Sequence, residues 1–151
     1  MLILLQKYSI NMWLEGGAQA EKLLIGTPMY GRTYRLKYNN QNTLGAPIDG
    51  PGDAGRYSGE AGFLAYYEIC SDNSWGKVWN VTNSVLYAYK NYQWVSYDDC
   101  NTIAVKIQWA VEHNLGGVMI WSLESDDFNG ICGGEKYPLL KSINRGLGRL
   151  S

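Results

Sequence analysis

Two short apolar runs constrain the fold of this chain more than any other feature of its sequence. The first spans residues 22–28 and the second spans residues 117–121. Neither run alternates apolar with polar side chains, which is typical of strands buried on both faces. Before the first run, residues 8–14 have apolar side chains at helical spacing, and Gly16 and Gly17 then end the helix. A helix, a short loop and a buried strand form the repeating unit of a parallel α/β fold.

Two further segments with helical spacing flank the second run. Residues 103–111 place apolar side chains at i, i+4, i+7 and i+8, which predicts an amphipathic helix with caps supplied by residues 98–101. Residues 137–147 also gather their apolar side chains on one helical face. The predicted order is therefore helix, strand, a long intervening segment, helix, strand and helix.

The intervening segment, residues 34–97, has a different character. Six glycines and two prolines occur before its first aromatic stretch, which indicates many tight turns. The aromatic stretches lie at residues 63–67, 85–89 and 94–97, and they are typical of antiparallel strands joined by hairpins. We interpret this segment as an insertion between two α/β units.

The length of the chain limits what these units can build. The chain has 151 residues, whereas a closed (β/α)8 barrel needs about 250. We therefore predict that the chain is either a fragment or a piece completed by other residues. Met1–Leu5 is apolar, but it is too short to cross a bilayer and lacks the features of a secretion signal. We predict that it is an irregular start, and we expect no membrane span.

Composition indicates a globular protein in which flat polar aromatics are common. Hydrophobic residues make up 46% and charged residues 18% of the chain. The net charge is -1 and no run of Lys or Arg occurs, so the sequence gives no sign of a basic surface for nucleic acid. Tryptophan (6) and tyrosine (12) greatly outnumber phenylalanine (2). Their rings suit sugar binding, although ordinary core and rim aromatics are the alternative.

Four motifs occur in order along the chain. They are KLLIGTPMYGRTY (22–34), GEAGFLAYYEIC (59–70), WVSYDD (94–99), and GGVMIW (116–121) followed by Asp126-Asp127-Phe128. Together they resemble the chitinases of glycoside hydrolase family 18, and most of all the animal chitinases and chitinase-like lectins. The resemblance runs from about Ser9 to Gly148.

The resemblance implies a fold class. It implies an α/β fold, with a partial TIM (β/α)8 barrel made of the last two strands and their helices, and an α+β insertion domain. Residues 1–32 would hold helix 6 and strand 7 of the barrel. Residues 33–97 would form the insertion domain, which lines one wall of a substrate groove. Residues 98–151 would hold helix 7, strand 8 and helix 8.

Candidate site residues follow partly from the barrel rule and partly from the resemblance. Barrel sites lie at the C-terminal ends of the strands, which singles out Tyr30, Arg32, Met119 and Trp121. From position alone, Trp121 and Met119 are equally well interpreted as core residues. For Tyr30 and Arg32, a rim tyrosine and a surface arginine are the better interpretation from position alone. The resemblance implies that Trp121 is the floor under the sugar. It also implies that the other groove residues are Tyr30, Arg32, Glu60, Phe63 and Met119.

The same family resemblance shows what the chain lacks. Catalysis there depends on Asp-x-x-Asp-x-Asp-x-Glu on the fourth strand, whose glutamate protonates the leaving oxygen. This run does not occur in the sequence, and the acidic cluster at residues 124–127 has the wrong spacing. We predict no catalytic residues and no activity for the chain alone. Its parent is a hydrolase or a chitinase-like lectin, and an inactive truncated product is the third alternative. We interpret Glu68, Asp126 and Asp127 as structural or solvated carboxylates.

Three cysteines leave one unpaired. The resemblance implies a Cys70–Cys132 disulfide, which suits an extracellular, secreted protein. Cys100 is then a free thiol or a partly buried small residue. Asn80 begins a glycosylation sequon.

No metal site and no cofactor are predicted. His113, the sole histidine, lies near a helix end, where a dipole or solvent role is the better interpretation. The partners that we expect are chitin or N-acetylglucosamine oligosaccharides, with no nucleic acid and no membrane. We expect a monomer.

Overall fold

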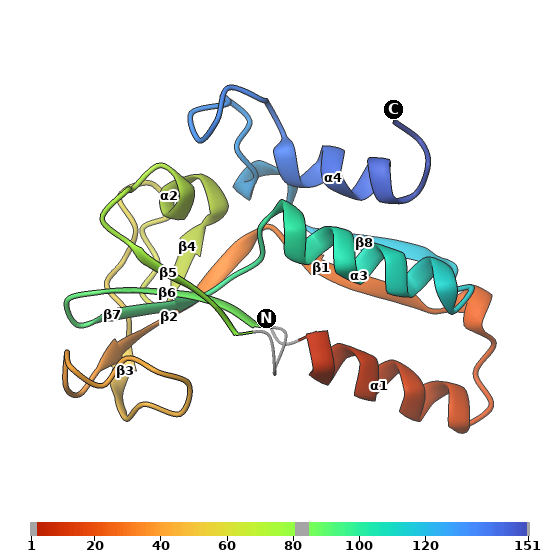
Figure 1. Ribbon diagram of the computed structural model, residues 1–151, viewed down its shortest axis with the longest axis horizontal. Helices are drawn as coiled ribbons and strands as arrows, with labels where there is room; N and C mark the ends of the chain where they lie inside the picture. The colour runs from red at the N-terminus through yellow and green to blue at the C-terminus, as the bar shows by residue number, and fades with distance from the viewer. Residues whose placement is uncertain (1–2, 81–84, 151) are drawn as a thin grey trace.

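The computed structural model describes residues 3–80 and 85–150 of the chain. Its elements fall into two groups, each built around one sheet (Figure 1). A two-stranded sheet lies beside three helices at one end of the molecule. A larger sheet with one short helix occupies the other end.

The smaller sheet consists of the two predicted buried strands. β1 (Leu24–Pro28) and β8 (Gly117–Trp121) are parallel neighbours, although almost ninety residues separate them along the chain. Their register sets Leu24 opposite Gly117 and Pro28 opposite Trp121. The prediction that the two runs form parallel strands is confirmed. The prediction that both strands are buried on both faces is wrong, because Leu24, Met119 and Trp121 are exposed and no residue of β8 is buried. In the part of the chain that the structure describes, this sheet has only these two strands to cover its residues.

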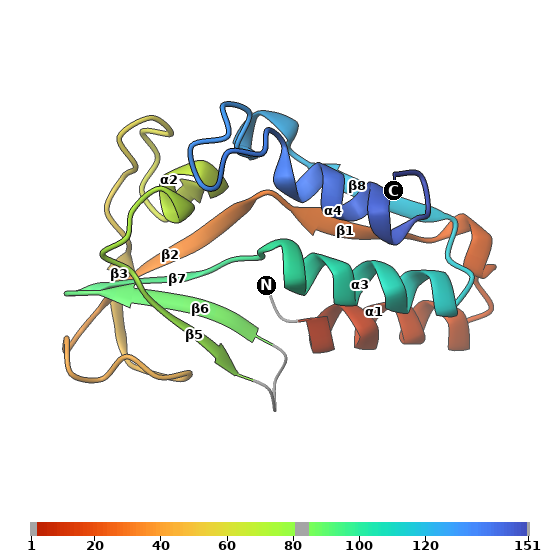
Figure 2. The ribbon, with the colours of Figure 1, turned by 45° about the horizontal axis from the view of Figure 1, so that its top comes forward.

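Three helices accompany this sheet (Figures 1 and 2). They are α1 (Ile3–Glu15), α3 (Cys100–Glu112) and α4 (Pro138–Gly146). α3 begins as predicted, because the side chain of Asp99 accepts a hydrogen bond from the Thr102 N–H at 2.9 Å. The apolar faces of α3 and α4 meet in the main core, whose members from these helices are Ile103, Ile107, Leu139 and Ile143.

α1 is longer than its apolar spacing predicts. The expectation of an irregular start was wrong for Ile3–Leu5, which belong to the first turn of the helix, while Met1 and Leu2 lie outside the described residues. The reason is tertiary. The Gln6 side chain donates a hydrogen bond to the Gly26 carbonyl of β1, and one turn later Ile10 packs in a second core cluster with Ile25. These contacts hold the first turns of α1 against the sheet. The helix ends at Gly16-Gly17, as predicted.

The larger sheet is antiparallel and has the strand order β3-β2-β7-β6-β5, with β4 also paired to β2. Its strands are β2 (Tyr30–Leu36), β3 (Ile48–Pro51), β4 (Phe63–Ala65), β5 (Gly76–Asn80), β6 (Val85–Lys90) and β7 (Gln93–Ser96). Hairpins in the intervening segment are therefore confirmed. The aromatic stretch 63–67 is a strand only in part, because Tyr66 begins a short helix, α2 (Tyr66–Cys70).

Met29 joins the two sheets. Its side chain is fully buried in the main core, and its backbone lies between β1 and β2. The Met29 N–H donates to the Trp121 carbonyl at 2.9 Å, and its carbonyl accepts from the Tyr66 N–H at 3.1 Å. The chain thus passes from the parallel sheet into the antiparallel sheet at a residue that is fixed on both sides.

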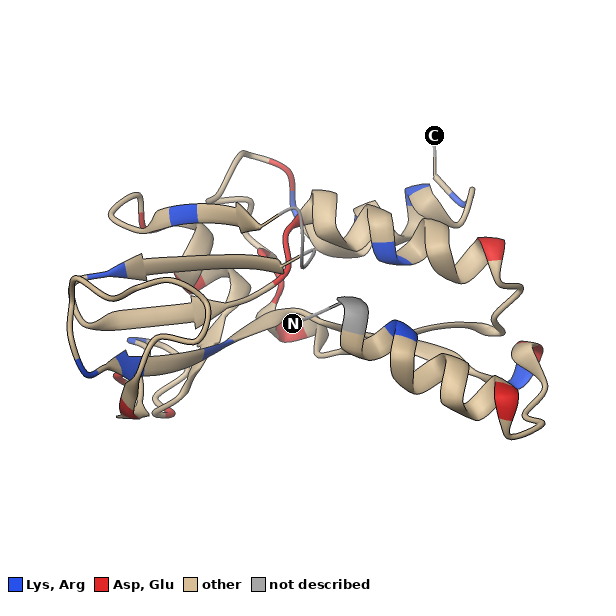
Figure 3. Ribbon diagram, turned by 60° about the horizontal axis from the view of Figure 1, so that its bottom comes forward, with Lys and Arg blue, Asp and Glu red and all other residues tan. Residues whose placement is uncertain are grey.

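Charged residues of both signs are distributed along the ribbon (Figure 3), in keeping with a net charge of -1. Among the described helices, none has the length and apolar character that a bilayer crossing requires. Asn80 ends β5, and the other two residues of its sequon lie outside the described residues.

One buried ion pair ties the end of the larger sheet to α3. Lys106 and Asp98 form a hydrogen-bonded pair whose side chains are 1% and 2% exposed. Lys106→Met leaves the Asp98 charge buried without a partner, so we expect a loss of about 3–5 kcal/mol in the free energy of unfolding. Chemical denaturation followed by circular dichroism measures it.

Lys141→Met is the matched control, because Lys141 pairs with Glu135 at the surface. It should cost no more than about 1 kcal/mol. Adding Asp98→Asn to Lys106→Met should recover part of the loss by removing the stranded charge. Equal stability of the two lysine variants would contradict a structural role for the buried pair.

Candidate functional site

The C-terminal end of β8 presents a large exposed aromatic ring. The Trp121 side chain is 66% exposed, and Met119 on the same face of the strand is 46% exposed. Met119 lies over Gly26, where an added Cβ would be 3.5 Å from its Cε atom. The peptide bond between Trp121 and Ser122 is cis. Because Trp121 is so exposed, the alternative of a buried core tryptophan is wrong for this chain.

A second cluster forms on the larger sheet. Tyr30 and Arg32 lie two residues apart on β2, and Arg32 is paired with Phe63 of β4. The rings of Tyr30 and Phe63 stack with centroids 4.9 Å apart, and the Arg32 guanidinium lies 5.1 Å from the Tyr30 centroid. Glu60 completes the cluster, 4.0 Å from Arg32. We name Tyr30, Arg32, Glu60 and Phe63 the sheet cluster.

The sheet cluster can offer hydrogen bonds to a ligand. The side chains of Arg32 and Glu60 are 56% and 66% exposed, so their ion pair is worth at most about 1 kcal/mol. A ligand with hydroxyl or amide groups can replace this pairing at small cost. The guanidinium supplies up to five N–H donors, and the stacked rings supply a flat apolar surface.

The pairing of β1 with β8 shows how the six predicted site residues are distributed between the two sheets. The structure brings four of them into mutual contact as the sheet cluster and places Met119 and Trp121 on β8. Trp121 lies opposite Pro28, and Tyr30 follows Pro28 by two residues. Pro28 and Met29 therefore connect the strand position opposite Trp121 with the first residue of the sheet cluster.

A cavity of about 280 Å³ continues from the sheet cluster and adds residues that the sequence analysis missed. Tyr34 and Trp94 line it together with Tyr30 and Arg32. Tyr34 is paired with Trp94, so both lie on the same face as Arg32. The alternate spacing of Tyr30, Arg32 and Tyr34 was the available sign that Tyr34 shares this face.

The carboxylates interpreted as structural or solvated are structural. The Asp126 side chain is fully buried and accepts from the Leu139 and Leu140 N–H groups at the first turn of α4. Burial raises the pKa of Asp126, although these hydrogen bonds oppose the shift. Asp126 thus attaches the loop after β8 to the start of α4.

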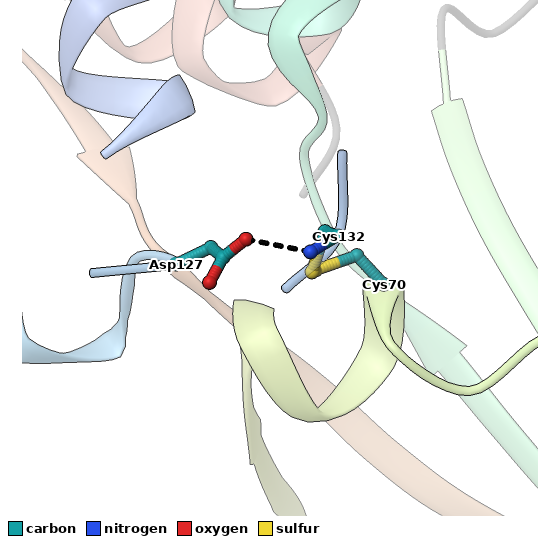
Figure 4. Close-up of side chains that lie close together, drawn as sticks. All are labelled: Cys70, Asp127 and Cys132. Carbon is teal, nitrogen blue, oxygen red and sulfur yellow. Dashed lines mark hydrogen bonds between the residues drawn. A yellow bond between two sulfur atoms is a disulfide. The ribbon is translucent and has the colours of Figure 1, made fainter. Parts of the chain in front are cut away.

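Asp127 and the disulfide hold the next part of that loop (Figure 4). The Asp127 carboxylate accepts from the N–H groups of residues 130, 131 and 132 at 2.8–3.0 Å. Cys132 is bonded to Cys70 of α2, which confirms the predicted pairing, and Cys100 is a free, half-buried thiol. The ligand atoms of Cys70, Asp127 and Cys132 lie within 4.8 Å of one another. Because the two sulfur atoms form a disulfide, neither is a thiolate that could bind a metal ion. The cluster therefore stabilises the loop after β8.

Glu68 holds the loop that leads into the sheet cluster. Its carboxylate accepts from the N–H groups of Tyr57, Ser58 and Ala65 at 2.8–3.3 Å. Burial favours the protonated form, but these hydrogen bonds outweigh it and lower the pKa of Glu68. The same bond to Ala65 explains why α2 begins where a continued strand was predicted.

His113 is the C-cap residue of α3. Its ring stacks on Trp109 with centroids 4.1 Å apart, and Nδ1 lies 2.8 Å from the Trp109 carbonyl oxygen. These contacts account for its position at the helix end.

The chain is similar in sequence and in structure to known proteins. Residues 5–126 match the family described as glycosyl hydrolases family 18. The chain is 45% identical over 145 residues to probable chitinase 10 of Drosophila melanogaster, covering 93% of the chain and 6% of that protein.

Two solved structures are also similar. One is the Ostrinia furnacalis group IV chitinase in complex with allosamidin (TM-score 0.88, 39% identity, 92% of this chain and 38% of that one). The other is human YKL-39, described as a pseudo-chitinase with retained chitooligosaccharide binding (TM-score 0.90, 41% identity, 95% and 40%). The chain therefore spans at most two fifths of the length of these proteins. The expected fold class, a partial barrel with an α+β insertion, agrees with these neighbours.

The lowered pKa of Glu68 predicts how stability depends on pH. A carboxylate whose pKa is lower in the folded state stabilises the fold above its unfolded pKa, and this contribution is lost as pH falls through the folded value. Glu68→Gln should therefore cost about 1–2 kcal/mol at pH 7, because the amide keeps a single acceptor oxygen and its NH2 group cannot accept from the backbone N–H that faces it. The difference from the unchanged chain should shrink as the solution is acidified below pH 4.

Unfolding curves recorded between pH 3 and pH 7 measure this difference. Glu15→Gln, at the exposed end of α1, is the control and should leave the pH dependence unchanged. A Glu68→Gln effect that is the same at every pH would contradict the assignment.

Proposed function

Because the chain belongs to family 18 of the glycosyl hydrolases, we propose that it contributes one wall and the floor of a groove that binds chitin or N-acetylglucosamine oligomers. In this proposal β1 and β8 are the seventh and eighth strands of the parent barrel. Residues 33–97 are its insertion domain, between barrel parts at residues 1–32 and 98–151. The parent is an extracellular monomer, and the Cys70–Cys132 disulfide supports that compartment.

The exposed indole at the tip of β8 is the observation that carries the proposal. A pyranose ring presents C–H groups on its faces. Such a sugar face stacks on a large, flat aromatic ring whose own face is exposed. Trp121 has this exposure, and Met119 extends the apolar surface along the strand. Both lie at the end of the barrel strand where such sites are found.

The sheet cluster supplies polar groups beside this floor. Arg32 donates to sugar hydroxyl or acetamido oxygens, and Glu60 accepts from hydroxyl groups. Tyr30 and Phe63 form a second apolar surface. One of the two similar proteins was solved in complex with allosamidin, and the other is described as retaining chitooligosaccharide binding, which supports a ligand of this class.

The parent is proposed to hydrolyse β-1,4 bonds, and binding without hydrolysis is the second candidate. The likeness to a pseudo-chitinase favours the second candidate, and the likeness to insect chitinases favours the first. The Asp-x-x-Asp-x-Asp-x-Glu run decides between them, and it does not occur in this sequence. Substrate binding is therefore the part of the activity that this chain can contribute.

Trp121→Ala should weaken the binding of tetra-N-acetylchitotetraose to the chain by about tenfold, because it removes the stacking surface. Isothermal titration calorimetry or ligand-observed NMR measures the change. Trp79→Ala is the matched control, since Trp79 is 44% exposed on the edge strand β5. Equal effects of the two substitutions would reject the role of the β8 indole.

The chain alone should release no measurable product from a chromogenic N-acetylglucosamine oligomer. A positioned general acid contributes about 10²–10⁴ in rate. Glu60, the carboxyl group among the residues proposed for the groove, is 66% exposed and paired with Arg32, and we assign it to binding. A turnover assay checks this. A robust rate that Trp121→Ala abolishes would show that the chain carries a catalytic acid after all.

A further inference from the structure

A second group of aromatic side chains lies outside the proposed groove floor. Tyr57, Tyr67 and Phe128 come from three separate segments, namely the loop before β4, α2 and the loop after β8. The rings of Tyr67 and Phe128 meet edge to face with centroids 5.5 Å apart, and Tyr57 is tilted against Tyr67 at 6.0 Å. We name these three residues the aromatic corner.

The aromatic corner lines an open cavity of about 260 Å³, which Asn129 and Ile131 also line. Tyr57 is 68% exposed, Phe128 39% and Ile131 59%. This volume lies just below the range of about 300–1,000 Å³ for pockets that hold drug-sized ligands. It therefore suits a single small ring rather than an extended oligomer.

Independent contacts fix the segments that carry the three rings. Glu68 accepts from the Tyr57 N–H, as described above. Tyr67 belongs to α2, which the Cys70–Cys132 disulfide joins to the loop after β8. In that loop, Phe128 follows Asp127, whose carboxylate holds the next turn. The carboxylates and the disulfide thus preorganise a concave aromatic surface, and preorganisation lowers the entropic cost of binding a ligand.

The chemistry of the corner selects a neutral, polyhydroxylated ring. The rings provide apolar faces at steep angles to each other, and the Asn129 amide and two phenolic hydroxyls provide donors and acceptors around them. Among the described residues, Asp127 is the carboxylate that lines the cavity, and it is buried and already accepts from three N–H groups. Arg56, over the Tyr57 ring at 5.4 Å, adds a cationic donor at the edge.

We propose that the aromatic corner is a separate binding position for one pyranose ring of an N-acetylglucosamine-type sugar, outside the groove floor at Trp121. The identity of the sugar rests on the proposed function, whereas the position rests on the contacts of the corner. Two segments connect the corner with the groove. The loop that carries Tyr57 continues three residues later to Glu60, and the chain that leaves Trp121 reaches Phe128 seven residues later. A polymer bound in the groove could therefore bind the aromatic corner with a second sugar ring.

Backbone amide NMR of the 17.0 kDa chain tests both sites at once. The probes are N-acetylglucosamine and hexa-N-acetylchitohexaose, each titrated into the unchanged chain and into Trp121→Ala. We expect the amide signals of Asn129 and Gly130 to shift in both chains. Adding Tyr57→Ala to Trp121→Ala should weaken the remaining binding by about three- to tenfold.

Asn129→Ala is the second corner variant, and it removes a polar contact instead of a ring. Tyr92→Ala is the matched control, because Tyr92 is 44% exposed at the turn between β6 and β7. It should leave both sets of shifts unchanged. The spectrum of each variant without sugar shows whether it is folded.

The outcomes separate this inference from the proposed function. Shifts at β8 with none at residues 128–131 would overturn the aromatic corner and leave the groove in place. Shifts at the corner with none at β8 would support the corner and reject the groove floor. An absence of shifts at both would reject both.

Discussion

The parallel pairing of β1 with β8 is the constraint on which the rest of the structure depends. Its register sets Pro28 opposite Trp121, and the Met29 N–H then bonds the Trp121 carbonyl. Residues from the two ends of the chain thus form one strand pair. The antiparallel sheet begins at the next residue, Tyr30. A slip of one residue in this register would turn the Trp121 indole toward the helices and bury it.

Two buried carboxylates, one half-buried carboxylate and a disulfide fix the loops next to these strands. Asp126 attaches the loop after β8 to α4, Asp127 shapes the turn that contains Cys132, and Glu68 holds the loop that precedes β4. They accept from backbone N–H groups of loops, of the first turn of α4 and of the last residue of β4. A buried donor left without a partner would cost about 1–3 kcal/mol. The irregular segments that carry ligand-facing side chains are thereby fixed without regular secondary structure.

The sequence predicted those parts of the fold that local patterns determine. Uniform apolar runs revealed β1 and β8, and the spacing of apolar residues together with the Asp99 cap revealed α3. The first turn of α1 was missed because it depends on the contact of Gln6 with Gly26, twenty residues away. The switch from strand to helix at Tyr66 was missed because aromatic residues favour strands locally, whereas the hydrogen bonds of Glu68 favour the helix.

The candidate site was predictable to a different degree. The barrel rule singled out Tyr30, Arg32, Met119 and Trp121 from their positions, but only the family resemblance pointed to Glu60 and Phe63. The aromatic corner escaped both approaches, because its three rings are distant in sequence and meet only through the disulfide and the loop contacts. Such a site becomes visible only in three dimensions.

The central claim is that the Trp121 indole and the Tyr30–Arg32 pair face one sugar-binding cleft. Intermolecular nuclear Overhauser effects between tri-N-acetylchitotriose and the aromatic protons of the chain test it most directly. We expect contacts from sugar ring protons to the Trp121 indole and from the same trisaccharide to Tyr30 or Phe63. Contacts confined to other exposed tryptophans, such as Trp13 or Trp79, with none at Trp121, would contradict it.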